Sequence, residues 1–242
     1  MKSRNLPETD IANIAFRSVS EKSKMLEAWL KPRQGSGSYN PFRQTSGDAI
    51  NRQLPLYPEG QVRTPWEKLE QLVVAKCRGD EQLLGMNIPV ARSTHDFAVA
   101  TGLTAEPIDM RSLTLAGGER YDFGQNLLLR FDGGVAVAFP DLRRTGQLSL
   151  HGRRVAFSVM HQRFRENFPD NSSLALQVWR YRNNDDRSIE VIHHTDEPLY
   201  TYEELSADFS ETYSIFNALR SHADNERRNK DGDQDYGPLF GT

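Results

Sequence analysis

An arginine-rich face on one predicted helix carries the side chains best suited to binding an anion. Apolar residues recur every four positions along residues 155–168, which is the spacing of an amphipathic helix. Arg154, His161 and Arg165 fall on another, polar face of that helix. Because a guanidinium group donates paired hydrogen bonds to phosphate or carboxylate, we expect an anion-binding face here. Its candidate residues are Arg143, Arg144, Arg153, Arg154, His161 and Arg165.

The charge distribution leaves three explanations open for this face. Residues 141–182 contain 8 arginines and 3 acidic residues, a net charge of +5, whereas residues 183–242 contain 5 basic and 14 acidic residues, a net charge of −9. The basic block would suit a nucleic acid or another anionic partner. It would equally suit an acidic surface on a protein partner, or the acidic C-terminal segment of the same chain.

Two carboxylates on predicted strands suggest an enzymatic alternative. Asp141 follows a predicted strand directly, and Glu190 lies on the last predicted strand. Such a pair could hold a divalent metal ion that activates water, with His161 assisting, as in a divergent metal-dependent nuclease. Nucleases of the PD-(D/E)xK type also need a lysine on the next strand, and the chain has no lysine between Lys76 and Lys230. The leading prediction is therefore a non-enzymatic binding or adaptor protein, without a cofactor or a metal site.

The N-terminal segment, residues 1–31, is predicted to be a tail followed by an amphipathic helical arm. Ser18 and Glu21 have the spacing of a capping box. The apolar stripe behind it consists of Met25, Leu26, Trp29 and Leu30. A helix of this kind beside a flexible linker often docks onto a protein partner or a second copy of its chain. The alternative is that the helix packs on its own domain.

The remaining sequence predicts the elements that position these candidates. Residues 32–63 are rich in Gly, Ser, Pro and Asn and predict a flexible linker. Residues 64–102 predict a helical subdomain of three short helices. Within residues 103–222, a hairpin and a helix occur twice in succession, so we expect an α+β core of ββαββα order. The second hairpin has apolar residues on both sides, which indicates that both faces of the sheet are covered. Residues 223–242 predict an acidic, disordered tail.

Composition excludes several classes of protein. Only 37% of the 242 residues are hydrophobic, and the mean hydropathy is −0.65. No segment approaches the roughly 18–20 consecutive apolar residues that a transmembrane helix needs. The N-terminus lacks the apolar stretch of a secretory signal, and the single cysteine, Cys77, allows no internal disulfide. We therefore expect a cytoplasmic protein.

Overall fold

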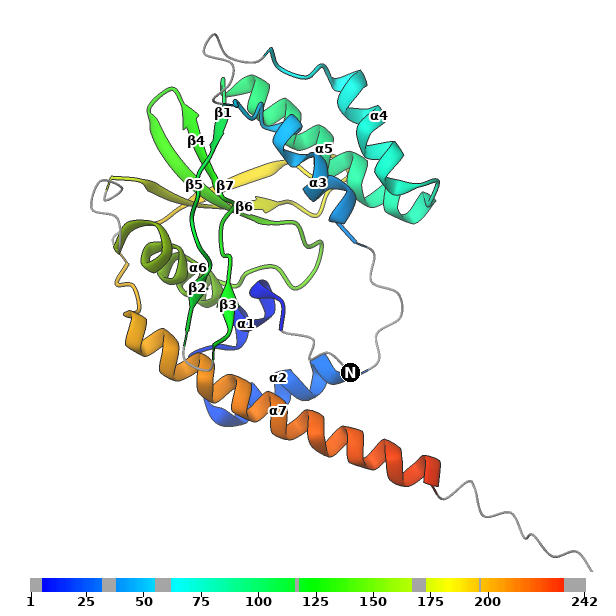
Figure 1. The fold of residues 1–242 in the computed structure, drawn as a ribbon, viewed down its shortest axis with the longest axis vertical. Helices are drawn as coiled ribbons and strands as arrows, with labels where there is room; N and C mark the ends of the chain where they lie inside the picture. Colours follow the sequence, from blue (N-terminus) through cyan, green and yellow to red (C-terminus); the bar gives the residue numbers. More distant parts are fainter. Residues whose placement is uncertain are drawn as a thin grey trace, which may run out of the picture.

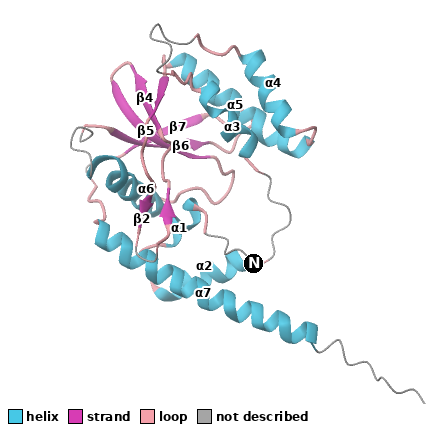
Figure 2. Cartoon of the chain, in the orientation of Figure 1, coloured by secondary structure: helices cyan, strands magenta, loops and turns pink. Residues whose placement is uncertain are grey.

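A mixed sheet of five strands forms the centre of the protein, and helices cover both of its faces (Figure 1). The computed structural model describes residues 6–31, 38–54, 62–115, 118–166, 173–195 and 197–232, with side chains as far as Asn225. In spatial order the strands are β1 (Thr104–Pro107), β4 (Leu127–Phe131), β5 (Gly134–Asp141), β6 (Ala175–Tyr181) and β7 (Ile189–His193). A separate small sheet pairs β2 (Leu113–Thr114) with β3 (Arg120–Tyr121). The predicted α+β class is confirmed (Figure 2).

The central strands bury apolar side chains on both sides. Val137 and Phe139 of β5 belong to one buried cluster, and Ala136 and Ala138 belong to the other. This two-sided burial is typical of strands covered by helices on both faces. Strands β5 and β6 run parallel and are joined by helix α6 (Leu150–His161), while the other neighbouring strands are antiparallel. The two predicted hairpins and the covered second face are thereby confirmed.

One face of the sheet is covered by α6 and by both ends of the chain. Helix α6 ends in a π-helical turn, η1 (Gln162–Glu166). Next to it lie α1 (Glu8–Ile14), α2 (Val19–Leu30) and α7 (Tyr202–Gly232) (Figure 1). The 31 residues of α7 span about 46 Å at 1.5 Å per residue. The C-terminal half of this helix therefore reaches beyond the rest of the described protein.

The other face is covered by the helical subdomain, which consists of α3 (Asn40–Ala49), α4 (Trp66–Cys77) and α5 (Glu81–Ala100). Leu69, Val73 and Cys77 recur at helical spacing on one side of α4 and are fully buried. They join the apolar cluster that includes Trp179 and Tyr181 of the sheet. Cys77 is thus a buried thiol within this core.

The predicted flexible linker contains a helix, and the prediction is wrong for residues 40–49. Helix α3 has few strong helix formers, but Pro41 stands in its first turn and Phe42 and Ile50 are buried against α5 and the sheet. Tertiary packing therefore stabilises a helix that local propensity does not favour. Residues 32–37 and 55–61 of the predicted linker lie outside the described residues.

Two further predicted boundaries differ from the structure. Helix α5 is continuous through Pro89. The buried Asn87 accepts a hydrogen bond from the Phe42 backbone and donates one to the Ser38 carbonyl, which fixes the helix against α3. The chain therefore has two helices in 64–102 where three were predicted. Helix α7 continues through residues 223–232 of the predicted tail, and residues 233–242 lie outside the described part. None of the described helices is both long and apolar enough to cross a membrane.

Candidate functional site

The predicted N-terminal arm is packed onto the body of the protein. Leu26 is completely buried, and Met25, Trp29 and Leu30 are partly buried against the same core. The indole nitrogen of Trp29 donates a hydrogen bond to Asp10 at 3.0 Å. The predicted partner-binding residues thus make intramolecular contacts, so the helix is packed on its own domain and is not a free arm. An amphipathic stripe alone does not distinguish docking on a partner from docking on the same chain.

A buried ion pair fastens α2 to α7. Lys22 is completely buried, and its ammonium group lies 2.7 Å from Asp208 and 2.5 Å from Glu211. The burial of a lysine is favourable only when its charge is paired, so this contact fixes the position of the helix. Lys22 lies one turn before Leu26 on the same side of α2, and sequence reasoning missed it because only the apolar members of that side were counted. The acidic residues on the polar side of α7 were the available signal.

Helix α1 is clipped onto the N-terminus of α6 by Asn13. Its side-chain oxygen accepts hydrogen bonds from the Ser149 backbone at 2.9 Å and hydroxyl at 3.0 Å, and its amide donates to the Gln147 carbonyl at 3.1 Å. A Cβ atom at Gly152 would lie 2.2 Å from the same oxygen. The close approach of the two helices therefore requires glycine at position 152.

Three of the predicted anion-binding arginines are held by groups of the same chain. Arg143 forms two hydrogen bonds with Asp10 at 2.6 and 2.9 Å, Arg154 donates to the Pro198 carbonyl at 2.7 Å, and Arg165 donates to the Leu174 carbonyl at 2.7 Å. Two of these partners are backbone carbonyls and one is the Asp10 carboxylate, and Arg154 meets the C-terminal segment through a carbonyl group and not through an acidic side chain. These arginines stabilise the connections around α6, and the structure does not bring the predicted set together as one open surface.

The other three candidates differ in their surroundings. His161 lies 3.0 Å from Glu166. The Arg153 Nε atom is buried without a hydrogen-bond partner in the described structure. Burial is the main cause that lowers the pKa of the Arg153 guanidinium group, and the positive charge of the neighbouring Arg180 lowers it further. Arg144 is exposed and makes no hydrogen bond with a described residue. Nucleic-acid binding through this set of residues stays a prediction, and its most accessible member is Arg144 in the loop before α6.

The two carboxylates of the nuclease alternative lie on strands that are not neighbours. Asp141 on β5 is paired in register with Arg180 on β6, which is paired with Glu190 on β7. The Arg180 side chain stands between the carboxylates and lies 3.9 Å from Glu190. His161 is at the C-terminal end of α6, about 17 Å along the helix axis from the start of the helix, which follows the loop after Asp141. This arrangement does not bring the three proposed catalytic residues together.

Asp141 has a structural contact of its own. One carboxylate oxygen accepts a hydrogen bond from the Leu148 backbone at 2.7 Å, so Asp141 closes the loop before α6. The other oxygen is buried without a partner in the described structure. Burial raises the pKa of this carboxyl, although the Leu148 hydrogen bond opposes the shift. Among the described residues, no group of three or more His, Cys, Asp or Glu side chains is placed to hold a metal ion.

Comparison with known proteins identifies the family. Residues 9–229 match the family described as "Sliding clamp-binding bacterial toxin SocB", and the chain belongs to this family. The "DNA replication inhibitor toxin SocB" of Caulobacter vibrioides (strain NA1000 / CB15N) is 28% identical over 237 residues, which cover 96% of this chain and 97% of the relative. No solved structure matches the chain. The similarity thus spans all the elements described above.

Proposed function

We propose that this protein binds a bacterial sliding clamp and thereby inhibits DNA replication in the bacterial cytoplasm. The observation that carries the proposal is the family match, because it extends over residues 9–229 and includes both helical layers and the sheet. The replication-inhibiting relative also aligns over nearly its whole length. Inhibition would follow from occupation of the clamp, which needs binding and no chemical step by the toxin. The proposal keeps the predicted protein-binding role and replaces nucleic acid with a protein as the principal partner.

We place the contact with the clamp outside the N-terminal helix. Protein interfaces draw much of their affinity from apolar side chains that become buried on binding. Leu26 already lies in the core, and its neighbours on the stripe are partly covered by α7. Val62 is the most exposed of the large apolar residues described, at 95%, and Leu54 is partly exposed. Both residues lie within the connection between α3 and α4, and they support a contact there.

A binding titration tests both the partner and the surface. The purified chain should bind its cognate sliding clamp saturably, as measured by isothermal titration calorimetry. Leu54→Asp combined with Val62→Asp should weaken the affinity at least about tenfold, which corresponds to the loss of one strong interfacial contact. Val19→Asp is the matched control, because Val19 is an exposed valine, at 54%, in the first turn of α2. An acidic residue is compatible with a helix N-terminus, so this variant should bind within about twofold of the wild type.

The outcomes separate the possibilities. An affinity loss caused by Val19→Asp and not by the Leu54 and Val62 changes would return the contact to the N-terminal helix. Absence of saturable binding to the clamp would refute the proposed function itself. Circular dichroism spectra of each variant would verify that the fold is retained.

A further inference from the structure

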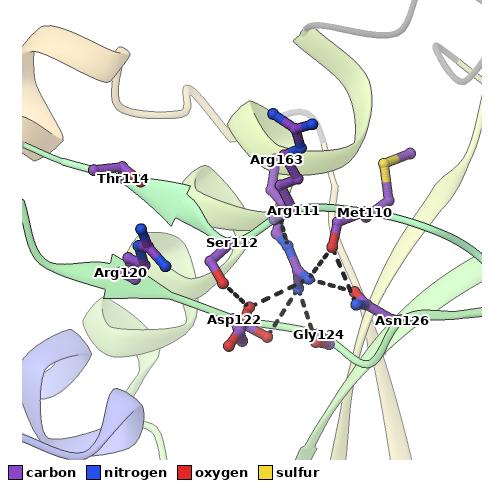
Figure 3. A pocket seen from close by; sticks show the side chains of 9 residues that line it. All are labelled: Met110, Arg111, Ser112, Thr114, Arg120, Asp122, Gly124, Asn126 and Arg163. Carbon is purple, nitrogen blue, oxygen red and sulfur yellow. Dashed lines mark hydrogen bonds and ion pairs between the residues drawn. The ribbon is translucent and has the colours of Figure 1, made fainter.

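A polar pocket of about 690 Å³ lies where the β2–β3 hairpin meets the end of α6 (Figure 3). Arg163, a residue that is only 4% exposed, lines the pocket. Its guanidinium group donates hydrogen bonds to the carbonyl oxygens of Met110, Arg111, Asp122, Phe123 and Gly124 and to the side chain of Asn126. Arg163 therefore joins η1 to two other segments of the chain, residues 110–111 and 122–126, in one fixed arrangement.

The β2–β3 hairpin presents a polar face to this pocket. Residues directly opposite in an antiparallel pair point to the same side, and Thr114 is paired with Arg120. Ser112 and Asp122 continue that side, with a hydrogen bond of 2.6 Å between them. The alternate residues Leu113 and Tyr121 are buried on the opposite side, which fixes the orientation of the hairpin. The pocket is thus built on a hairpin whose other face lies in the core.

The charges around the pocket do not cancel. Asp122 lies 3.4 Å from Arg163, so the negative charge of one is offset by the positive charge of the other. Arg111 and Arg120 also line the pocket, and both are exposed. Neither guanidinium group makes a hydrogen bond or an ion pair with a described residue. Two positive charges therefore remain available to a ligand.

The geometry points to a binding site for the phosphate group of a small phosphorylated ligand, an interaction separate from the proposed clamp contact. Two guanidinium groups from different segments offer more donors than one carboxylate accepts, whereas a phosphate has enough oxygens for both. The Thr114 hydroxyl lies beside Arg120 and adds a further donor. The volume is in the range of small-molecule sites, so it accommodates more than the phosphate alone. We therefore assign Arg111 and Arg120 as the residues that bind phosphate.

The test uses inorganic phosphate as the probe and the full-length chain. Phosphate is titrated at constant ionic strength while the amide resonances are followed by NMR. We expect saturable shifts at residues 111–114 and 120–124, with a dissociation constant on the order of 1 mM. Arg111→Gln combined with Arg120→Gln should weaken binding at least about tenfold. The control is Arg92→Gln combined with Arg130→Gln, which removes the same charge from exposed sites elsewhere, where each arginine is paired with a surface carboxylate.

Three results would overturn the assignment. The shifts could fail to saturate, or the control variant could lose as much affinity as the pocket variant, which would indicate attraction by net charge alone. Glutamate could also bind as tightly as phosphate, which would make this a carboxylate site. Because all four arginines are exposed, unchanged spectra outside the substituted regions would show that each variant keeps the fold. Clamp binding by the pocket variant should equal that of the wild type, so failure of this assignment leaves the proposed function unaffected.

Discussion

The two helical layers of this protein are attached to the same sheet by different means. Helices α3–α5 are held mainly by apolar contacts, in which Phe42, Leu69 and Val90 are almost completely buried. The N-terminal hairpin of α1 and α2 also has an apolar centre, but buried polar groups surround it. Lys22 forms ion pairs with two carboxylates of α7, and Asn13 accepts a hydrogen bond from the backbone at the start of α6.

Apolar contacts attach a helical layer to the sheet, whereas directional polar contacts also fix its orientation. The stabilising free energy of apolar contacts is roughly proportional to the buried apolar area and depends little on direction. Charged and amide hydrogen bonds need particular partners at particular distances, so they select one docked position. The N-terminal hairpin is therefore fixed in one position relative to α6 and α7. That arrangement supports a structural role for the segment whose sequence suggests a free docking arm.

The largest effect should come from the apolar layer. Phe42→Ala should lower the free energy of unfolding by about 3–5 kcal/mol, because it removes a buried ring that packs edge-on against Tyr181. The loss should be nearly independent of salt concentration. Urea denaturation gives the value, with Val74→Ala on the exposed side of α4 as a control that changes stability by less than about 0.5 kcal/mol. A loss no larger than that of the control would contradict the assignment of Phe42 to the core.

The second effect concerns the ion pair of the hairpin. Lys22→Met should cost about 2–3 kcal/mol, since it leaves the carboxylate of Asp208 without its cationic partner, while the half-exposed Glu211 regains water. Lys24→Met is the matched control, because Lys24 is exposed on the same helix. Equal unfolding free energies for the two variants would show that the ion pair does not hold α2.

The third effect concerns the clip between α1 and α6. Gly152→Ala should cost about 1–3 kcal/mol, because the new methyl group collides with the Asn13 side chain. In an Asn13→Ala background the same change should cost at least about 1 kcal/mol less. The double-mutant cycle is measured by urea denaturation. Additive effects would mean that the two side chains do not meet.

The smallest effect should be a pH dependence at Asp141. Burial raises the pKa of this carboxyl in the folded state, so its contribution to stability is fully present below the unfolded pKa of about 3.8 and is lost as the pH rises through the folded pKa. The amide side chain introduced by Asp141→Asn is neutral at every pH. The stability of the variant relative to the wild type should therefore increase between pH 3 and pH 8, as measured by urea denaturation. Glu8, whose pKa burial also raises, is present in both proteins and cancels. A difference that is constant or falls with pH would exclude the raised pKa.

Local patterns in the sequence predicted the elements that depend on local interactions. The predicted capping box at Ser18 is present, and the alternation of apolar residues located both hairpins of the sheet. Helix α3 was missed because its stability comes from buried contacts with distant residues. The connection that contains β1 was also not recognised as part of the sheet, since its four residues give too short a pattern.

The candidate site was less predictable than the fold. An arginine on a helix surface looks the same in sequence whether it faces a ligand or a carbonyl group. Arg154 and Pro198 are 44 residues apart in the chain, and no local signal joins them. The exposed Val62 is a single apolar residue in an irregular segment and has no periodicity that would mark it. Family similarity was needed to propose the clamp as a partner.

We propose that this protein inhibits replication by occupying the sliding clamp. The most direct test of this proposal is clamp-dependent DNA synthesis by the cognate polymerase in a reconstituted reaction, with increasing amounts of the protein. We predict that synthesis decreases, that excess clamp restores it, and that clamp-independent synthesis on a short template is unaffected. Inhibition that persists with excess clamp, or that affects both reactions equally, would contradict the account.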